Sequence, residues 1–121
     1  RGSFGRRDGS ASRSTLDARS VAIVRMGAVP HVLIIHEVDD YPAWKAVFDD
    51  AASLRREAGE RSFQVLRDAG DPNRIVHFST WPSLDAARGF FESPELVAIR
   101  AQAGVHDPEF HYLQELDAGV L

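Results

Sequence analysis

The chain of 121 residues contains no cysteine and a single methionine, Met26. Without cysteine, the protein cannot form disulfides, thiolate zinc sites or a cysteine nucleophile, so any metal site must use histidine and carboxylates. Long apolar runs are also missing, because His36 interrupts the longest one, VLIIHEV, far short of the ~18 residues of a membrane span. These absences predict a soluble, cytoplasmic, globular protein.

Several motifs for catalysis or cofactor binding are missing as well. The sequence has no phosphate-binding loop, no dinucleotide fingerprint and no Gly-x-Ser-x-Gly elbow for a serine nucleophile. No two histidines are separated by the short spacings that often bind a metal. We therefore predict no tightly bound nucleotide, flavin or haem, and no metal.

Charge divides the chain into two parts. Residues 1–25 are rich in Gly, Ser and Arg and carry six arginines against two aspartates, whereas the remainder has 8 basic and 16 acidic side chains, a net charge of −8. A domain this acidic repels phosphate backbones, which argues against a nucleic-acid partner. We interpret residues 1–25 as a leader or vector-derived segment outside the core, with a transit peptide as the alternative, and residues 26–121 as one domain.

Hydrophobic periodicity and turn residues predict the order of the elements. Gly59 is a suitable end for the first helix, and Ser93 followed by Pro94 a suitable start for the last. The predicted strands are 31–38, 61–68, 74–81 and 109–116, the predicted helices are 39–59, 83–91 and 93–104, and residues 69–73 are a predicted turn.

The resulting order, β-α-β-β-α-β, is that of the ferredoxin-like α+β fold. Right-handed crossovers arrange the strands as 4-1-3-2 in an antiparallel sheet with the helices on one face. Strands 31–38 and 74–81 are apolar on both faces, so the apolar side chains of the helix-free face must also be buried against another surface. A second copy of the chain can supply this surface, and we predict a homodimer through the helix-free face.

Side-chain alternation brings candidate site residues together. His36 and His77 lie on central strands, and either Tyr112 or His111 could join them, depending on strand register. We predict a small-ligand pocket between sheet and helices, with these polar groups and an aromatic wall formed by Trp44, Phe48, Trp81, Phe90 and Phe91. Two alternatives stay open: hydrogen-bonded core histidines without a ligand, and a metal bound by His36, His77 and His111.

Two segments, VDDYPAWKAVFDD and HFSTWPSLDAARGFFESPEL, resemble the antibiotic-biosynthesis-monooxygenase-like family of the dimeric α/β-barrel superfamily. The resemblance extends over residues 30–117 and implies a homodimer with a ligand pocket in each protomer. It also implies that Trp81, at the end of its strand, lines that pocket. Members of this family include cofactor-free oxygenases, quinol oxygenases, polyketide cyclases and haem-degrading enzymes.

The sequence departs from the family pattern at one position. Many members carry a histidine nine or ten residues after the tryptophan, where this chain has Phe90 and Phe91. The departure argues against haem ligation and the commoner oxygenase arrangement. Our hypothesis is that His77, four residues before Trp81, replaces the missing imidazole.

The function predicted from these features is that of a small dimeric enzyme acting on an aromatic, polyketide or quinone-like molecule. The reaction would be cofactor-independent oxygenation or cyclisation, with His36 and His77 moving protons and Tyr112 orienting a substrate oxygen. Trp81, Phe90 and Phe91 would hold the rings. The alternatives are a non-catalytic dimer that binds a hydrophobic ligand, and a histidine-based metal enzyme.

Overall fold

The computed structural model describes residues 29–121, and Val29–Glu115 form one compact unit. The predicted leader, residues 1–25, lies outside the described residues. No helix in the described part of the chain is long and apolar enough to span a membrane.

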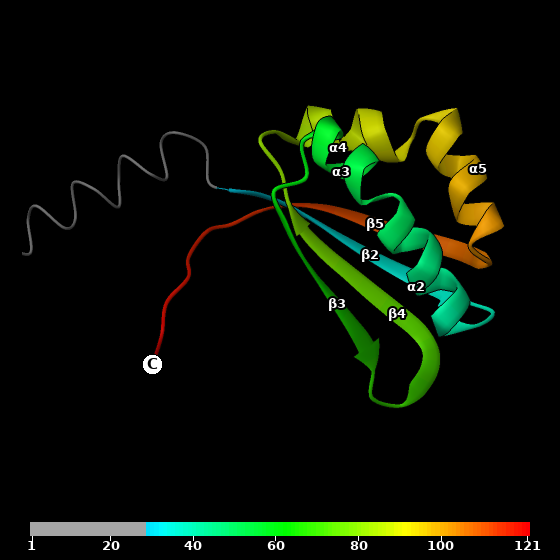
Figure 1. Cartoon of the computed structure of the whole chain (residues 1–121). Helices are drawn as coiled ribbons and strands as arrows, with labels where there is room; N and C mark the ends of the chain where they lie inside the picture. The colour runs from blue at the N-terminus through cyan, green and yellow to red at the C-terminus, as the bar shows by residue number, and fades with distance from the viewer. Residues whose placement is uncertain (1–28) are drawn as a thin grey trace, which may run out of the picture. The chain divides into compact units, whose positions relative to one another are not determined.

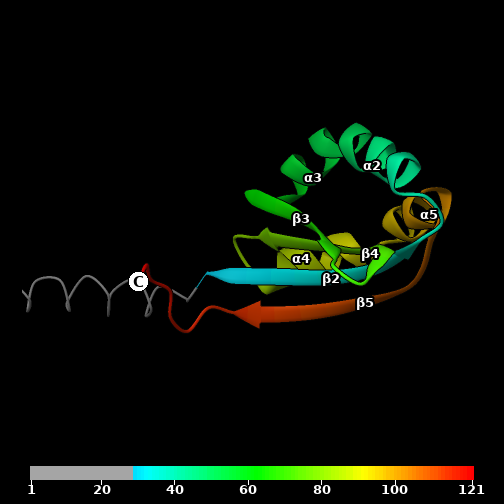
Figure 2. The same cartoon turned by 90° about the horizontal axis from the view of Figure 1, so that it is seen from below.

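The unit is a four-stranded antiparallel sheet with its helices on one face (Figures 1 and 2). The strand order is β3-β4-β2-β5, which confirms the order 4-1-3-2 and the ferredoxin-like α+β fold. The strands are β2 (Pro30–Val38), β3 (Ser62–Asp68), β4 (Asp71–Thr80) and β5 (Val105–Gln114).

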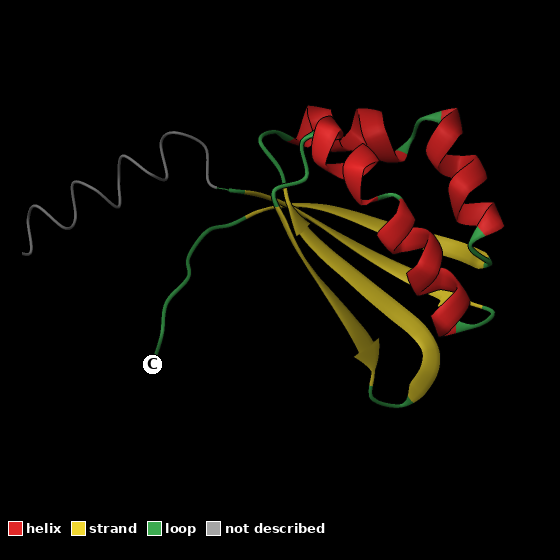
Figure 3. Cartoon of the chain, viewed as in Figure 1, coloured by secondary structure: helices red, strands yellow, loops and turns green. Residues whose placement is uncertain are grey.

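Side-chain caps begin three of the helices. Asp40, Ser83 and Ser93 each accept a hydrogen bond from a backbone N–H three residues further on, at 2.9, 3.0 and 3.3 Å. Pro also occupies the first turn of two of these helices, where its missing N–H costs nothing. The helices are α2 (Tyr41–Asp50), α3 (Ala52–Ala58), α4 (Leu84–Phe91) and α5 (Pro94–Gln102), coloured red in Figure 3.

The predicted helix 39–59 is divided in two at Ala51, whose φ and ψ of −86° and 6° end α2 before α3 begins. At this break the guanidinium of Arg55 donates a hydrogen bond to the carbonyl of Phe48 at 3.2 Å. A buried arginine thus satisfies a carbonyl at the end of α2, which periodicity alone does not reveal.

Two predicted boundaries were also wrong. The turn occupies only Ala69 and Gly70, because β4 already begins at Asp71. The last strand runs over 105–114 rather than 109–116, and so includes the predicted loop HDP. Because β5 is an edge strand, it tolerates Pro108 and an irregular register, with Asp107 at a φ of 47°.

The two faces of the sheet differ in burial. On the helix side Val32, Ile34 and Ile75 are at most 1% exposed and form the centre of the core. The helix-free face carries apolar side chains that are only half-buried or exposed: Leu33, Ile35, Val76, Phe78, Leu66 and Leu113.

Candidate functional site

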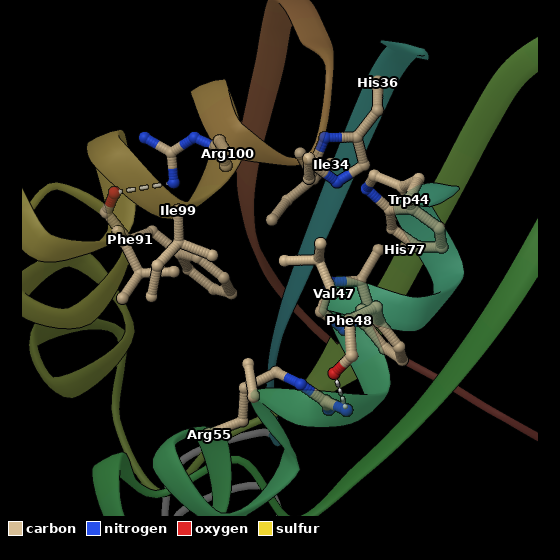
Figure 4. A pocket seen from close by; sticks show the side chains of 13 residues that line it. Ile34, His36, Trp44, Val47, Phe48, Arg55, His77, Phe91, Ile99 and Arg100 are labelled. Atoms are coloured by element: carbon tan, nitrogen blue, oxygen red, sulfur yellow. Dashed lines mark hydrogen bonds between the residues drawn. The ribbon is translucent and has the colours of Figure 1, made fainter. Parts of the chain in front are cut away.

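A cavity of about 50 Å³ lies between the helix side of the sheet and the helices (Figure 4). This volume admits a few water-sized groups and is well below the roughly 300–1,000 Å³ of a typical ligand pocket. Its lining is mostly apolar and includes two histidines and two arginines: Ile34, His36, Trp44, Val47, Phe48, Ala51, Arg55, His77, Phe91, Leu96, Ile99, Arg100 and Ala103.

His77 reaches the cavity from β4, opposite Ile34 of β2. Its Nε2 lies 2.9 Å from Oε2 of Glu60, and both side chains are 3% exposed. A carboxylate accepts hydrogen bonds, so Nε2 carries the proton and Nδ1 keeps its lone pair. The pair therefore holds the imidazole in one tautomer at the cavity wall.

Glu60 was not identified by the sequence analysis, because it falls between the predicted helix 39–59 and the predicted strand 61–68. Gly59, with a φ of 125°, reverses the chain after α3 and turns Glu60 inward. On its other side, Glu60 forms an ion pair with Arg55 at 3.1 Å. A charged residue next to a glycine is typical of an exposed turn, so the local pattern carries no signal for this burial.

Arg55 is also buried, with 7% of its surface exposed. Its guanidinium lies 3.8 Å from the centre of the Phe48 ring. The ion pair with Glu60 is short but poorly aligned, because Glu60 Oε1 and Arg55 Nε both lack a hydrogen-bond partner among the described residues. Two buried polar atoms beside the cavity are therefore available for further hydrogen bonds.

His36 enters the cavity from β2 and is 4% exposed. Burial, with smaller contributions from the charges of His77 and Arg100, lowers its pKa to about 3. The ring is therefore neutral near neutral pH, and its Nδ1 has no partner within residues 29–121. His36 can exchange hydrogen bonds with a ligand, but a proton that it accepts is held weakly.

Arg100, on α5, is a second lining residue that the sequence analysis did not single out. It donates a hydrogen bond to the carbonyl of Phe91 at 2.9 Å, and burial lowers its pKa. Its position four residues after Leu96, on the apolar stripe of the helix, is the signal that could have identified it.

The predicted aromatic residues fall into two groups. Trp44, Phe48 and Phe91 line the cavity, whereas Trp81 and Phe90 are not among its lining residues. Trp81 is completely buried, and its Nε1 donates to Ser79 Oγ at 2.8 Å. The Trp81 ring packs against Phe90 and Phe91, with centroids 5.6 and 5.3 Å apart. It thus supports the cavity wall from behind.

Tyr112 and His111 lie away from the cavity. Tyr112 is on the helix side opposite Val32, its hydroxyl donates to Glu92 at 3.4 Å, and burial followed by the charge of Glu92 raises its pKa. His111 is on the helix-free face, where it lies 2.6 Å from Glu109.

The proposed metal set of His36, His77 and His111 is therefore wrong, because His111 occupies the opposite face of the sheet from the other two. Within residues 29–121 no group of three His, Asp or Glu side chains is close enough to hold a metal ion.

The fold and site define an α+β protein with a partly polar cavity between a ferredoxin-like sheet and its helices. The model of the antibiotic biosynthesis monooxygenase family matches residues 39–102, more than half of the chain. The chain therefore belongs to the antibiotic biosynthesis monooxygenase family, as its resemblance indicated. A search of curated proteins found no match.

Several solved structures share this fold. A putative antibiotic biosynthesis monooxygenase from Caulobacter crescentus shares 18% identity with a TM-score of 0.60, over 76% of this chain and 93% of that one. SnoaB, a cofactor-independent oxygenase from Streptomyces nogalater, shares 17% identity with a TM-score of 0.61, and the match covers 76% of this chain and 96% of SnoaB. A monooxygenase from the ActVA-Orf6 gene of Streptomyces coelicolor, in complex with Nanaomycin D, shares 18% identity with a TM-score of 0.58. The match covers 78% of this chain and 93% of that one.

Proposed function

We propose that the protein is a cofactor-independent oxygenase of small aromatic molecules with an ionisable hydroxyl, such as phenols and hydroquinones. The observation that carries this proposal is the buried pair of His77 and Glu60 at an aromatic-walled cavity. A histidine fixed by a carboxylate is a suitable base for removing a hydroxyl proton. Membership of the monooxygenase family supports the same reaction class.

The proposed reaction needs no external reductant. His77 Nδ1 removes the phenolic proton, and the electron-rich phenolate reduces O₂ while a ring carbon forms the new C–O bond. The O–O bond of the resulting hydroperoxide breaks as that carbon loses its hydrogen as a proton. The products are a quinone and one water, so the substrate supplies all four electrons that O₂ accepts.

Other residues of the site have supporting roles in this proposal. His36 stays neutral and donates or accepts a hydrogen bond, because its pKa of about 3 makes it a weak base. Trp44, Phe48 and Phe91 contact the ring of the substrate. Tyr112 can orient an oxygen only of a ligand long enough to extend beyond Phe91 and Phe110.

The size of the cavity bears on the substrate. Even a single aromatic ring exceeds the few water-sized groups that about 50 Å³ admits, so side chains must move before any aromatic substrate binds.

Oxygen consumption tests the proposal. Purified protein is mixed with a panel of naphthols, naphthohydroquinones and anthrones, and O₂ uptake is recorded with an electrode while the products are identified by mass spectrometry. We expect uptake with at least one compound, and a loss of about 100-fold or more in His77→Gln, because general-base catalysis contributes roughly that much. His106→Gln is the matched control, since His106 is exposed and pairs with Asp39 away from the cavity.

Three results would distinguish the rivals. Uptake that His77→Gln leaves unchanged contradicts the role of this residue. Conversion of a compound without O₂ uptake favours cyclisation, and binding without any conversion favours the non-catalytic alternative.

The protein is also proposed to act as a homodimer through the helix-free face of the sheet. Leu66 and Leu113, on the two edge strands of that face, are 50% and 40% exposed, and Val76 and Phe78 lie half-buried between them on the central strand β4. A contiguous apolar surface of this kind needs a partner, and a second copy joined by a two-fold axis satisfies the need symmetrically.

A further inference from the structure

A second hollow lies along α3 and the start of β3, beside the connection between them. It is a groove of about 590 Å³, more than ten times the volume of the inner cavity. Three arginines and one glutamate give it a polar character. Its lining residues are Ala52, Arg55, Arg56, Gly59, Glu60, Arg61, Ser62, Phe63 and Pro82.

Within residues 29–121, Arg55 is the one residue that lines both the groove and the cavity. Its guanidinium lies 3.8 Å from the ring centre of Phe48, which faces the cavity, and 5.0 Å from that of Phe63, which faces the groove. The two rings are 5.3 Å apart in an edge-to-face arrangement. An aromatic surface thus runs from the groove to the cavity and is covered at its middle by one cation.

The ion pair of Arg55 with Glu60, which lies over this aromatic surface, is incompletely hydrogen-bonded. Arg55 Nε and Glu60 Oε1 are buried without a hydrogen-bond partner within residues 29–121. An unsatisfied buried polar atom destabilises the arrangement that contains it. A ligand oxygen that accepts a hydrogen bond from the Arg55 Nε–H would remove this penalty, so the surroundings of Arg55 favour an anion over a neutral group.

The groove is also electropositive within an acidic domain. Arg56 and Arg61 are exposed and form no ion pair among the described residues, whereas the charge of Arg55 is balanced by Glu60. Residues 26–121 carry a net charge of −8. Two cations without an ion-pair partner in the described part of the chain, both in one concave surface, therefore mark the place where an anion is attracted.

We propose that the groove binds the anionic group of an acidic aromatic ligand, such as a carboxylate, while the ring of that ligand enters the cavity beside Arg55. Arg56 and Arg61 hold the anion, and Phe63 and Phe48 guide the ring. The inference rests on the proposed function, because it assumes a ligand at His77, and it narrows the substrate class to aromatic compounds that carry a negative charge.

Two probes that share one ring system, one of them anionic and the other neutral, test this proposal. Calorimetric titrations with 2-naphthoate and with methyl 2-naphthoate are compared at low ionic strength for the full chain. We expect naphthoate to bind about tenfold more tightly, as two partly exposed ion pairs allow. The double variant Arg56→Gln/Arg61→Gln removes this preference and leaves the affinity for the ester within about twofold. Added salt reduces the preference of the unaltered protein.

Arg67→Gln is the matched control, because Arg67 is an exposed arginine over the ring of Tyr41 and does not line the groove. It should leave both affinities unchanged. Equal binding of the two probes, or a preference that survives in the double variant, overturns the anion site while the proposed function stands. Failure of both probes to bind overturns the anion site and also removes support for an aromatic ligand.

Discussion

Around His77, each neighbour limits what the imidazole can do. Glu60 fixes the proton on Nε2 from a distance of 2.9 Å, and Phe48 packs edge-to-face against the ring with centroids 4.9 Å apart. His36, two positions along the neighbouring strand from the residue opposite His77, stays neutral and so adds no second charge. The result is one oriented base in an apolar enclosure.

The buried His36 should make the protein sensitive to acid. Its pKa is about 3 when folded and 6.5 in the unfolded chain, so below pH 6.5 only the unfolded state takes up the proton. Stability is therefore lost as the pH falls from 6.5 towards 3. Between pH 7.5 and 4.5 we expect this residue to lower the free energy of unfolding by about 3 kcal/mol.

Urea titrations at the two pH values measure this loss. His36→Gln, which cannot titrate, should show a pH dependence smaller by that amount. An unchanged pH dependence in the variant would mean that His36 is protonated at little cost in the folded protein.

The ion pair of Arg55 with Glu60 gives a second prediction at this scale. Arg55→Met leaves a carboxylate buried without its cation and should destabilise the protein by about 3–5 kcal/mol. Adding Glu60→Gln removes that charge, so the double variant should recover part of the loss. Denaturant unfolding of the two single variants and the double variant gives the coupling energy, and simple additivity would contradict the interaction.

Among the secondary-structure elements, the connection from α3 to β3 determines where Glu60 lies. Gly59 adopts a φ of 125°, and a Cβ at this position would approach two atoms of the Pro82 ring to 3.2 Å. Both the backbone conformation and the space therefore require glycine.

Gly59→Ala should lower the free energy of unfolding by about 1–3 kcal/mol, because a strained backbone and a close contact add. Gly89→Ala is the control, since a Cβ there meets nothing within 4 Å and the residue lies in α4. That change should stabilise the protein by up to about 1 kcal/mol through helix propensity. Thermal unfolding distinguishes the two, and equal effects would show that the turn is not constrained.

Much of the arrangement of elements could be predicted because its determinants are local. Alternation in the strands placed His36 and His77 on the helix side, and the caps of the helices were readable from Ser93 and Pro94. Strand register was not readable, so the choice between Tyr112 and His111 needed the structure. Glu60 and Arg55 were not predicted because their burial depends on contacts of the α3–β3 connection with α3 and β4, which sequence periodicity does not encode.

At the scale of the whole molecule, we predict that two copies of the protein associate through the helix-free face of the sheet. Phe78→Glu places a charge in the middle of that face and should convert a dimer into a monomer at micromolar concentration, because an unpaired charge in an apolar interface costs several kcal/mol. Val97→Glu is the matched control, as Val97 is 53% exposed and lies on α5 of the helix layer. Light scattering after size exclusion measures both masses. A monomeric unaltered protein would contradict the predicted dimer.

In the proposed reaction, an aromatic substrate binds between sheet and helices with its hydroxyl at His77. A crystal structure of the protein with 2-naphthol, prepared without oxygen, tests this most directly. We expect the ring between Phe48 and Phe91, in a cavity widened around Val47, with the naphthol oxygen about 3 Å from His77 Nδ1. A naphthol bound elsewhere, or a ring in the cavity with its hydroxyl turned away from His77, would contradict the account.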